Sequence, residues 1–160
     1  MTASPLSLRI HSGGQTGVDR AALDAALAEG VAIGGWCPRG RRAEDGPIPD
    51  RYPLRETPTA AYAERTAWNV RDADATLVLT RGAPTGGTAT TIDVARELGK
   101  PLRIVDLEAD DVEPVAAWVR AHGIEVLNVA GPRESTAPGI HAEAERFAKS
   151  LLRLLREERG

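Results

Sequence analysis

A glycine-rich turn near the start of the chain has the residue types of an anion-binding loop. It spans residues 12–20, after an apolar-alternating run at residues 6–10 and before a segment with helical spacing at residues 21–29. Backbone N–H groups at the start of a helix attract anions, and glycine lets the backbone turn sharply and a ligand approach closely. The pattern predicts an oxyanion or phosphate site here, the alternative being a tight turn with no ligand.

Two later loops repeat this arrangement of an apolar run followed by polar and glycine residues. Residues 81–88 follow a nearly continuous apolar run at residues 75–80 and contain the helix-opening stretch Thr85-Gly86-Gly87-Thr88. Residues 131–135 follow another apolar run, at residues 125–130. In a parallel sheet these loops share one edge, so they can converge although they are far apart in sequence.

The segment at residues 38–49 is a proline-punctuated loop in which three arginines precede two acidic residues. Its prolines exclude a helix or a central strand. The guanidinium groups of Arg39, Arg41 and Arg42 could clamp a phosphate, because guanidinium pairs with oxyanions bidentately. The alternative is a solvated charged loop, and whether the loop closes over a ligand stays open.

Alternating strand and helix signals over the whole chain predict one α/β domain, residues 1–160, with an open, mostly parallel sheet covered by helices on both faces. The expected strands are residues 6–10, 32–37, 75–80, 102–107 and 125–130. The expected helices are residues 21–29, 59–72, 88–98, 112–122 and 139–156, with a fraying tail after residue 156.

The composition indicates which kinds of binding partner, metal site and cellular location can be expected. A net charge of −3 argues against nucleic acid, which favours a basic face. One cysteine, Cys37, allows no internal disulfide and no multi-cysteine metal site, and the three histidines lack ligand spacing, so no metal centre is expected. The sequence has no apolar run of about 18 residues, so no membrane span is expected. Met1–Pro5 lacks the features of a secretory signal. A cytoplasmic protein is expected.

Two common nucleotide motifs do not fit. A P-loop needs a lysine that the segment at residues 82–88 lacks. A dinucleotide fingerprint needs glycine at the position of Ser12 and an acidic residue after the second strand, where Pro38 and Arg39 stand. NAD is therefore not expected as a cofactor.

The stretch from Thr85 to Asp93 resembles the Pro-Gly-Gly-x-Gly-Thr-x-x-Glu motif of the LOG-like, "lysine decarboxylase"-labelled phosphoribohydrolases. Thr85 replaces the proline, Ala89 the third glycine, and Asp93 the catalytic glutamate. The resemblance implies cleavage of a nucleoside 5′-monophosphate at its N-glycosidic bond. Asp93 or Glu44 would be the catalytic carboxylate, and the shorter reach of Asp93 favours a binding protein over this enzyme.

A wider resemblance covers nearly the whole chain. Five ordered segments, residues 12–20, 34–38, 41–46, 80–88 and 128–135, are similar to the molybdenum cofactor carrier family, Rossmann-like relatives of the LOG proteins. The resemblance implies a homo-oligomer, a dimer or tetramer, that binds molybdenum cofactor or a related oxyanion such as molybdate or phosphate. A nucleotide-sensing module that turns nothing over is the third hypothesis.

In the binding hypothesis, the glycine-rich turns hold oxyanions through N–H groups and hydroxyls, arginines supply charge, and Asp19 and Asn128 orient the ligand. Replacing Gly14 by a bulky residue is expected to abolish binding and leave the fold intact. The expected ligand-binding residues are Gly13, Gly14, Gln15, Thr16, Gly17, Asp19, Arg20, Arg81, Gly82, Thr85, Gly86, Gly87, Thr88, Asn128, Gly131, Arg133, Glu134 and Ser135.

Overall fold

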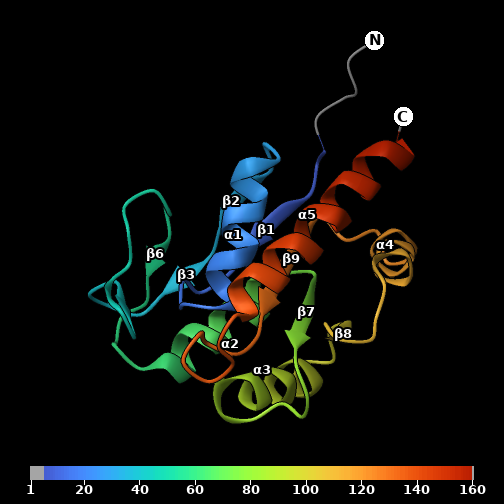
Figure 1. The fold of residues 1–160 in the computed structure, drawn as a ribbon. Helices are drawn as coiled ribbons and strands as arrows, with labels where there is room; N and C mark the ends of the chain where they lie inside the picture. Colours follow the sequence, from blue (N-terminus) through green and yellow to red (C-terminus); the bar gives the residue numbers. More distant parts are fainter. Residues whose placement is uncertain (1–5, 160) are drawn as a thin grey trace.

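A five-stranded, fully parallel sheet forms the centre of the protein (Figure 1). The computed structural model describes residues 6–159, so the prediction made for Met1–Pro5 lies outside the described residues. The strand order is β2-β1-β9-β7-β8, which places β9 between β1 and β7. The bounds are β1 Arg9–His11, β2 Ala32–Gly34, β7 Ala75–Thr80, β8 Leu102–Asp106 and β9 Val126–Ala130. The predicted parallel sheet is confirmed.

Helices cover both faces of this sheet, as predicted. Helices α1, α4 and α5 pack on one face, and α2 and α3 pack on the other (Figure 1). The bounds are α1 Val18–Ala28, α2 Tyr62–Asp72, α3 Gly86–Glu97, α4 Val112–Ala121 and α5 Ile140–Arg159. All six residues of β7 are buried, which agrees with its continuous apolar sequence.

The strand expected at residues 32–37 is divided at Gly35. There the backbone has φ +119°, and a Cβ would lie 2.5 Å from the Ser12 carbonyl oxygen, so the chain must leave the main sheet at a glycine. The next two residues, β3 Trp36–Cys37, pair instead with β6 Arg55–Glu56 in a separate small sheet. The Asn69 side chain accepts from the Trp36 N–H and donates to its carbonyl, which fixes the new direction.

The loop at residues 38–49 is held in place by hydrogen bonds from the Arg41 side chain to nearby backbone carbonyl groups. Strands β4 Arg42–Ala43 and β5 Gly46–Pro47 form a small antiparallel pair within it. The Arg41 guanidinium donates to the carbonyl oxygens of Ile48, Pro49, Tyr52 and Leu54. Because the Arg41 donors are used by these carbonyl oxygens, Arg41 is not the phosphate clamp that the sequence suggested. Beneath the loop, Leu23, Cys37, Ile48, Tyr52 and Leu54 form a small second core.

Helix α5 continues to Arg159, past the predicted end at residue 156. Arg153 and Arg156 both pair with the largely buried Glu29 carboxylate at the end of α1. Leu151, Leu152 and Leu155 are buried against the sheet. These contacts fix α5 as far as Arg156, and the fraying expected after that residue stays a prediction.

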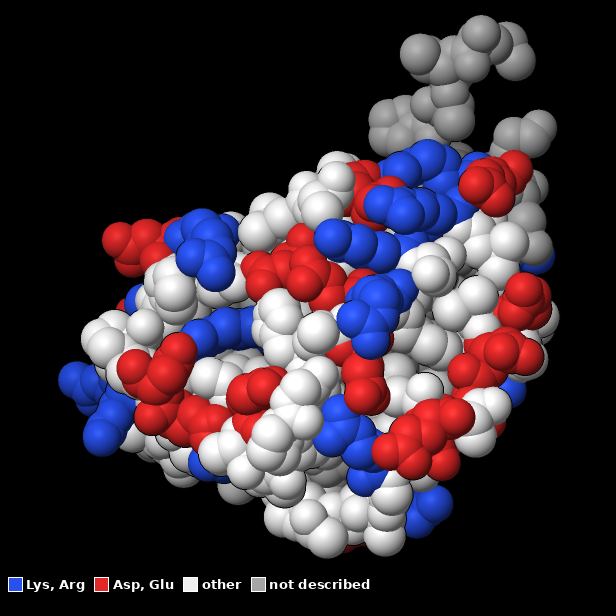
Figure 2. Space-filling model, in the orientation of Figure 1, with Lys and Arg blue, Asp and Glu red and all other residues white. Residues whose placement is uncertain are grey.

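The surface in view mixes charges of both signs (Figure 2). Acidic and basic side chains alternate over the α1 and α5 face, in keeping with a net charge of −3. Among residues 6–159, no helix has the length and hydropathy needed to cross a membrane. The same residues contain no cluster of three or more metal-ligating side chains.

Candidate functional site

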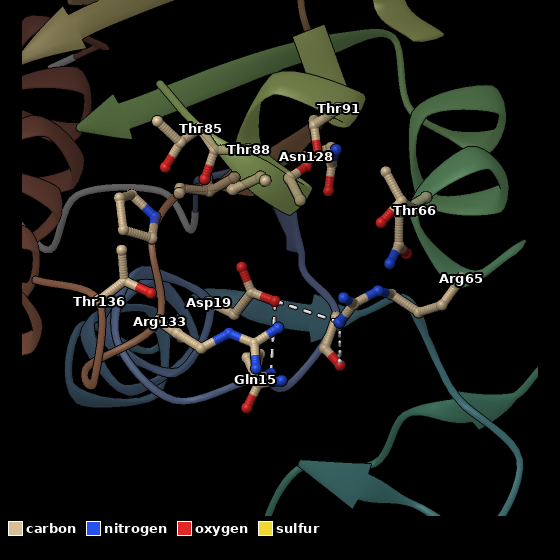
Figure 3. Close-up of a pocket in the computed structure, with 18 of the residues that line it drawn as sticks. Gln15, Asp19, Arg65, Thr66, Thr85, Thr88, Thr91, Asn128, Arg133 and Thr136 are labelled. Atoms are coloured by element: carbon tan, nitrogen blue, oxygen red, sulfur yellow. Dashed lines mark hydrogen bonds and ion pairs between the residues drawn. The ribbon is translucent and has the colours of Figure 1, made fainter. Parts of the chain in front are cut away.

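A cavity of about 370 Å³ lies at the carboxyl ends of the central strands, within the usual range for a small-molecule site. The loops after β1, β7 and β9 converge on it, as the parallel topology predicts, and α2 supplies a fourth wall. Figure 3 shows side chains from these elements around one space. Predicted site residues that line it are Gly13, Gln15, Asp19, Thr85, Gly86, Gly87, Thr88, Asn128, Gly131, Arg133 and Ser135.

The start of α3 presents an open helix N-terminus to the cavity. Thr85 is the N-cap and makes no side-chain capping bond, and the N–H groups of Gly86 and Gly87 have no partner within the helix, whereas the Thr88 N–H donates to the Thr85 carbonyl at 3.2 Å. A Cβ at Gly86 or Gly87 would meet nothing within 4 Å, so a ligand atom can approach this backbone. The positive φ of Gly86, +54°, is a conformation that favours glycine. An anion placed here faces the positive end of the helix.

The first glycine turn, in contrast, already satisfies several of its own N–H groups. The Gln15 N–H donates to the Asp19 carboxylate at 3.3 Å, and the Val18 N–H donates to the Pro132 carbonyl at 3.2 Å. The backbone at Gly17 lies so close to Pro132 that a Cβ there would overlap the carbonyl oxygen. The turn therefore locks α1 to the loop after β9, and the protein's own carboxylate occupies the predicted anion position.

Asp19 and Arg65 form a buried ion pair in the cavity wall. The Arg65 guanidinium lies 3.4 Å from the Asp19 carboxylate and donates to the Gly13 carbonyl at 3.2 Å. Burial raises the pKa of Asp19, although the charge of Arg65 and the Gln15 N–H oppose that shift. A Cβ at Gly13 would overlap the Arg65 side chain, so a larger residue there would displace Arg65 from this ion pair. Figure 3 shows this pair joined across the wall.

The three arginines expected to supply charge have different partners. Arg20 pairs with both carboxylate oxygens of Asp45, at 2.5 and 2.7 Å, and donates to the Gly14 carbonyl. Arg81 pairs with Glu143 at 2.8 Å and lies outside the cavity lining. Arg133 lines the cavity, and no carboxylate of residues 6–159 forms an ion pair with it. Its guanidinium lies over the Tyr62 ring, 5.8 Å from the ring centroid, and among these three arginines it is the one without an ion pair, so its charge can act on a bound anion.

Gln15 is 6% exposed and its side-chain amide is only half satisfied. Its Oε1 accepts from the N–H groups of Thr16 and Glu44, at 3.1 and 2.8 Å. Its Nε2 is buried and has no acceptor among residues 6–159. A buried donor without a partner is costly, and such groups are rare in folded proteins.

Other predicted site residues line a second cavity of about 610 Å³, between the start of α1, the loop at residues 44–52 and the start of α5. These are Thr16, Gly17, Arg20 and Glu134, while Ser135 lines both cavities. Gly14, Arg81 and Gly82 line neither. A Cβ at Gly14 would lie 2.9 Å from Ile48 and from Leu54, on a backbone with φ +81°. Substitution there disturbs packing, contrary to the expectation of an intact fold.

The two candidate catalytic carboxylates lie outside the first cavity. Asp93 is exposed on α3 and lines neither cavity. Glu44 accepts hydrogen bonds from the Thr16 and Ser135 hydroxyls and so joins three loops. Burial alone would raise the pKa of Glu44, but these hydrogen bonds outweigh it and lower the pKa. The one carboxylate in the lining of the first cavity is Asp19.

Sequence reasoning missed the wall formed by α2 and several threonines. The missed lining residues include Arg65, Thr66, Asn69, Thr91 and Thr136. Arg65, Thr66 and Asn69 share one helical face, and this polar stripe was the signal that could have found them. Thr91 stands one turn after Thr88 on α3, so it extends the predicted helix start into the cavity.

Comparison with known proteins shows which family has this fold and this set of loops. Residues 10–152 match the family model described as "Circularly permutated YpsA SLOG family". The chain belongs to that family. A crystal structure of a "putative molybdenum carrier protein" from Syntrophus aciditrophicus SB is similar to this SLOG chain, with 42% sequence identity and a TM-score of 0.87. The match covers 92% of this chain and 96% of that one.

These matches confirm the resemblance that the sequence motifs predicted, and with it the Rossmann-like α/β fold of this SLOG-family chain. A search of curated proteins finds no match.

Proposed function

We propose that the cavity between the starts of α1 and α3 binds molybdenum cofactor or a related oxyanion, and that the protein carries this ligand without transforming it. The neighbour from Syntrophus aciditrophicus SB bears a molybdenum carrier name and shares 42% of the sequence. A homo-oligomer, predicted from the same resemblance, is part of this proposal.

The observation that carries the proposal is the unpaired guanidinium of Arg133 in the same cavity as the open N-terminus of α3. Both favour negative charge, and both act in a partly enclosed space where water screens less. A phosphate end of the ligand fits beside Gly86 and Gly87, where the absence of side chains leaves room. Arg133 then balances negative charge from the opposite wall (Figure 3).

The hydrolase alternative requires a carboxylate beside a bound ribose. Asp93, the residue in the motif position, is exposed outside the cavity, so this alternative lacks the catalytic group that the motif assigns to it. Release of free adenine from adenosine 5′-monophosphate, lost in Asp93→Asn, would support it. A nucleotide sensor would bind the same monophosphate and release nothing.

Native mass spectrometry of protein made in a host that synthesises molybdenum cofactor tests the carrier proposal. We expect a pterin-plus-molybdenum adduct on the wild-type protein, and at least a tenfold lower occupancy in Arg133→Met, because the unpaired charge is removed. Arg42→Met is the matched control. Arg42 is an exposed arginine that lines neither cavity, so its loss should leave occupancy unchanged.

A wild-type protein that carries no adduct from the proficient host would contradict the proposal. Equal loss of the adduct in Arg133→Met and Arg42→Met would contradict the assignment of the site. The same spectra report the number of subunits and so test the homo-oligomer.

A further inference from the structure

Tyr62, the first residue of α2, has its ring beside two of the cationic groups that line the first cavity. The Arg65 guanidinium carbon lies 5.5 Å from the ring centroid, and that of Arg133 lies 5.8 Å from it. Both distances are within the range of about 6 Å in which a guanidinium is attracted to an aromatic face. Tyr62 itself is not part of the cavity lining. One ring outside the lining therefore contacts cations from two cavity walls, α2 and the loop after β9.

The two arginines differ in their other partners. Arg65 pairs with the Asp19 carboxylate at 3.4 Å and donates to the Gly13 carbonyl at 3.2 Å. The Arg133 side chain makes no ion pair or hydrogen bond within residues 6–159, and the Tyr62 ring is the partner that remains to it. An arginine side chain has many rotamers, and holding it in one of them costs conformational entropy. The ring contact is therefore what restricts the Arg133 guanidinium.

The direction in which Arg133 points increases the importance of this contact. Figure 3 shows Arg65 and Arg133 extending toward each other from opposite sides of the cavity. Two guanidinium groups repel each other, and the Asp19 carboxylate pairs with Arg65 alone. The face of an aromatic ring carries partial negative charge. The Tyr62 ring thus offsets the repulsion and keeps Arg133 turned toward the cavity instead of into water.

The ring of Tyr62 can be changed apart from its hydroxyl and apart from the core. The hydroxyl makes no hydrogen bond within residues 6–159. The residue is 36% exposed at the start of its helix, so it contributes little to the packed interior. Substitutions at exposed positions of this kind usually change stability only slightly. An effect on ligand binding can therefore be measured on a folded protein.

We propose that Tyr62 is a positioning residue for anion binding, whose ring holds the Arg133 guanidinium in the wall of the first cavity where negative charge of the ligand binds. This inference rests on the proposed function, since it takes Arg133 to bind the anion. Tyr62 acts without touching the ligand. It lowers the entropy that Arg133 loses on binding, because the guanidinium is already held in place.

Isothermal titration with molybdate measures this effect. Tyr62→Leu removes the aromatic face and keeps an apolar side chain, and we expect it to weaken binding about threefold, the usual effect of a partly exposed cation–π contact. Tyr62→Phe keeps the ring and should bind like the wild type. Trp68→Leu is the matched control, because the Trp68 ring on the same helix contacts Arg71 at 4.6 Å and both residues line neither cavity. Its affinity should be unchanged.

A double substitution tests whether Tyr62 acts through Arg133. Tyr62→Leu should cause no further loss of affinity when it is added to Arg133→Met, whereas a general role in shaping α2 would weaken binding equally in both backgrounds. If the wild type retains the cofactor and binds no free molybdate, the same variants are compared by their occupancy in native mass spectra.

Three results would overturn the inference and leave the proposed function standing. These are equal affinities of the wild type and Tyr62→Leu, a loss in Tyr62→Phe or Trp68→Leu as large as in Tyr62→Leu, and a Tyr62→Leu effect that persists with Arg133→Met. A wild-type protein that binds neither molybdate nor the cofactor would overturn the proposed function as well.

Discussion

His11, at the end of β1, is half-buried, and both of its ring nitrogens are covered and have no hydrogen-bond partner among residues 6–159. Burial first, and the nearby charge of Arg9 second, lower its pKa below the ordinary value of 6.5. The unfolded chain therefore takes up a proton at a higher pH than the folded protein does. The contribution of His11 to stability is complete above pH 6.5 and is lost as the pH falls from 6.5 through the lowered pKa.

Replacing His11 by Phe should remove this loss of stability in acid, because the new ring cannot take up a proton. Urea unfolding at about pH 7.5 and about pH 5.5 measures the effect. We expect the wild-type protein to lose more free energy of unfolding between these two conditions than His11→Phe does. Equal losses would show that the ring does not titrate in this range.

The three arginines illustrate what sequence can predict at the level of a residue. Arg20, Arg81 and Arg133 were all predicted to supply charge, because each stands in a polar loop after a strand or at a helix start. Only Arg133 is left unpaired in the cavity, since Asp45 and Glu143 bind the other two. Asp45 stands 25 residues from Arg20, and Glu143 stands 62 from Arg81. Sequence spacing carries no signal for pairs that only the tertiary fold creates.

Two helix starts have the same glycine signature and different roles. At the start of α1, Gly17 has φ +78° and touches the loop after β9, and at the start of α3, Gly87 faces open space. Gly17→Ala should therefore lower the free energy of unfolding by at least about 2 kcal/mol, through strain and overlap. Gly87→Ala should leave stability unchanged or slightly higher, and it should weaken ligand binding because its methyl group occupies the space beside the helix start.

Thermal unfolding and a ligand titration on both variants separate these roles. A stable Gly17→Ala protein would contradict the assignment of the first turn to α1 anchoring. Undiminished ligand binding by Gly87→Ala would contradict the phosphate position at the start of α3.

Strand and helix positions were mostly predictable, because apolar periodicity reports burial on a sheet or on one helix face. The sequence at residues 32–37 was the main exception. Its apolar residues predict one strand, but Gly35 turns the chain out of the sheet after Gly34, and the last two residues pair with Arg55–Glu56. The two glycines signalled close backbone approach, and they did not signal which element would come close.

The arrangement of the whole molecule explains why distant loops meet. Parallel topology alone predicted that the loops after β1, β7 and β9 share an edge. The order β2-β1-β9-β7-β8, with the last strand in the centre, is a tertiary result that brings the loop after β9 between the other two. That placement puts Arg133 into the cavity and Pro132 against the start of α1. The polar face of α2 completes the site, and none of its residues was among the predicted ligand-binding residues.

The most direct test of the central claim is a crystal structure of the protein purified from a cofactor-producing host, with anomalous diffraction measured at the molybdenum absorption edge. The account predicts one strong anomalous peak in the cavity lined by Arg133, Gln15 and the start of α3, with density for an organic phosphate leading from it. A peak in the cavity at residues 44–52, a peak on the surface, or no peak at all would contradict it.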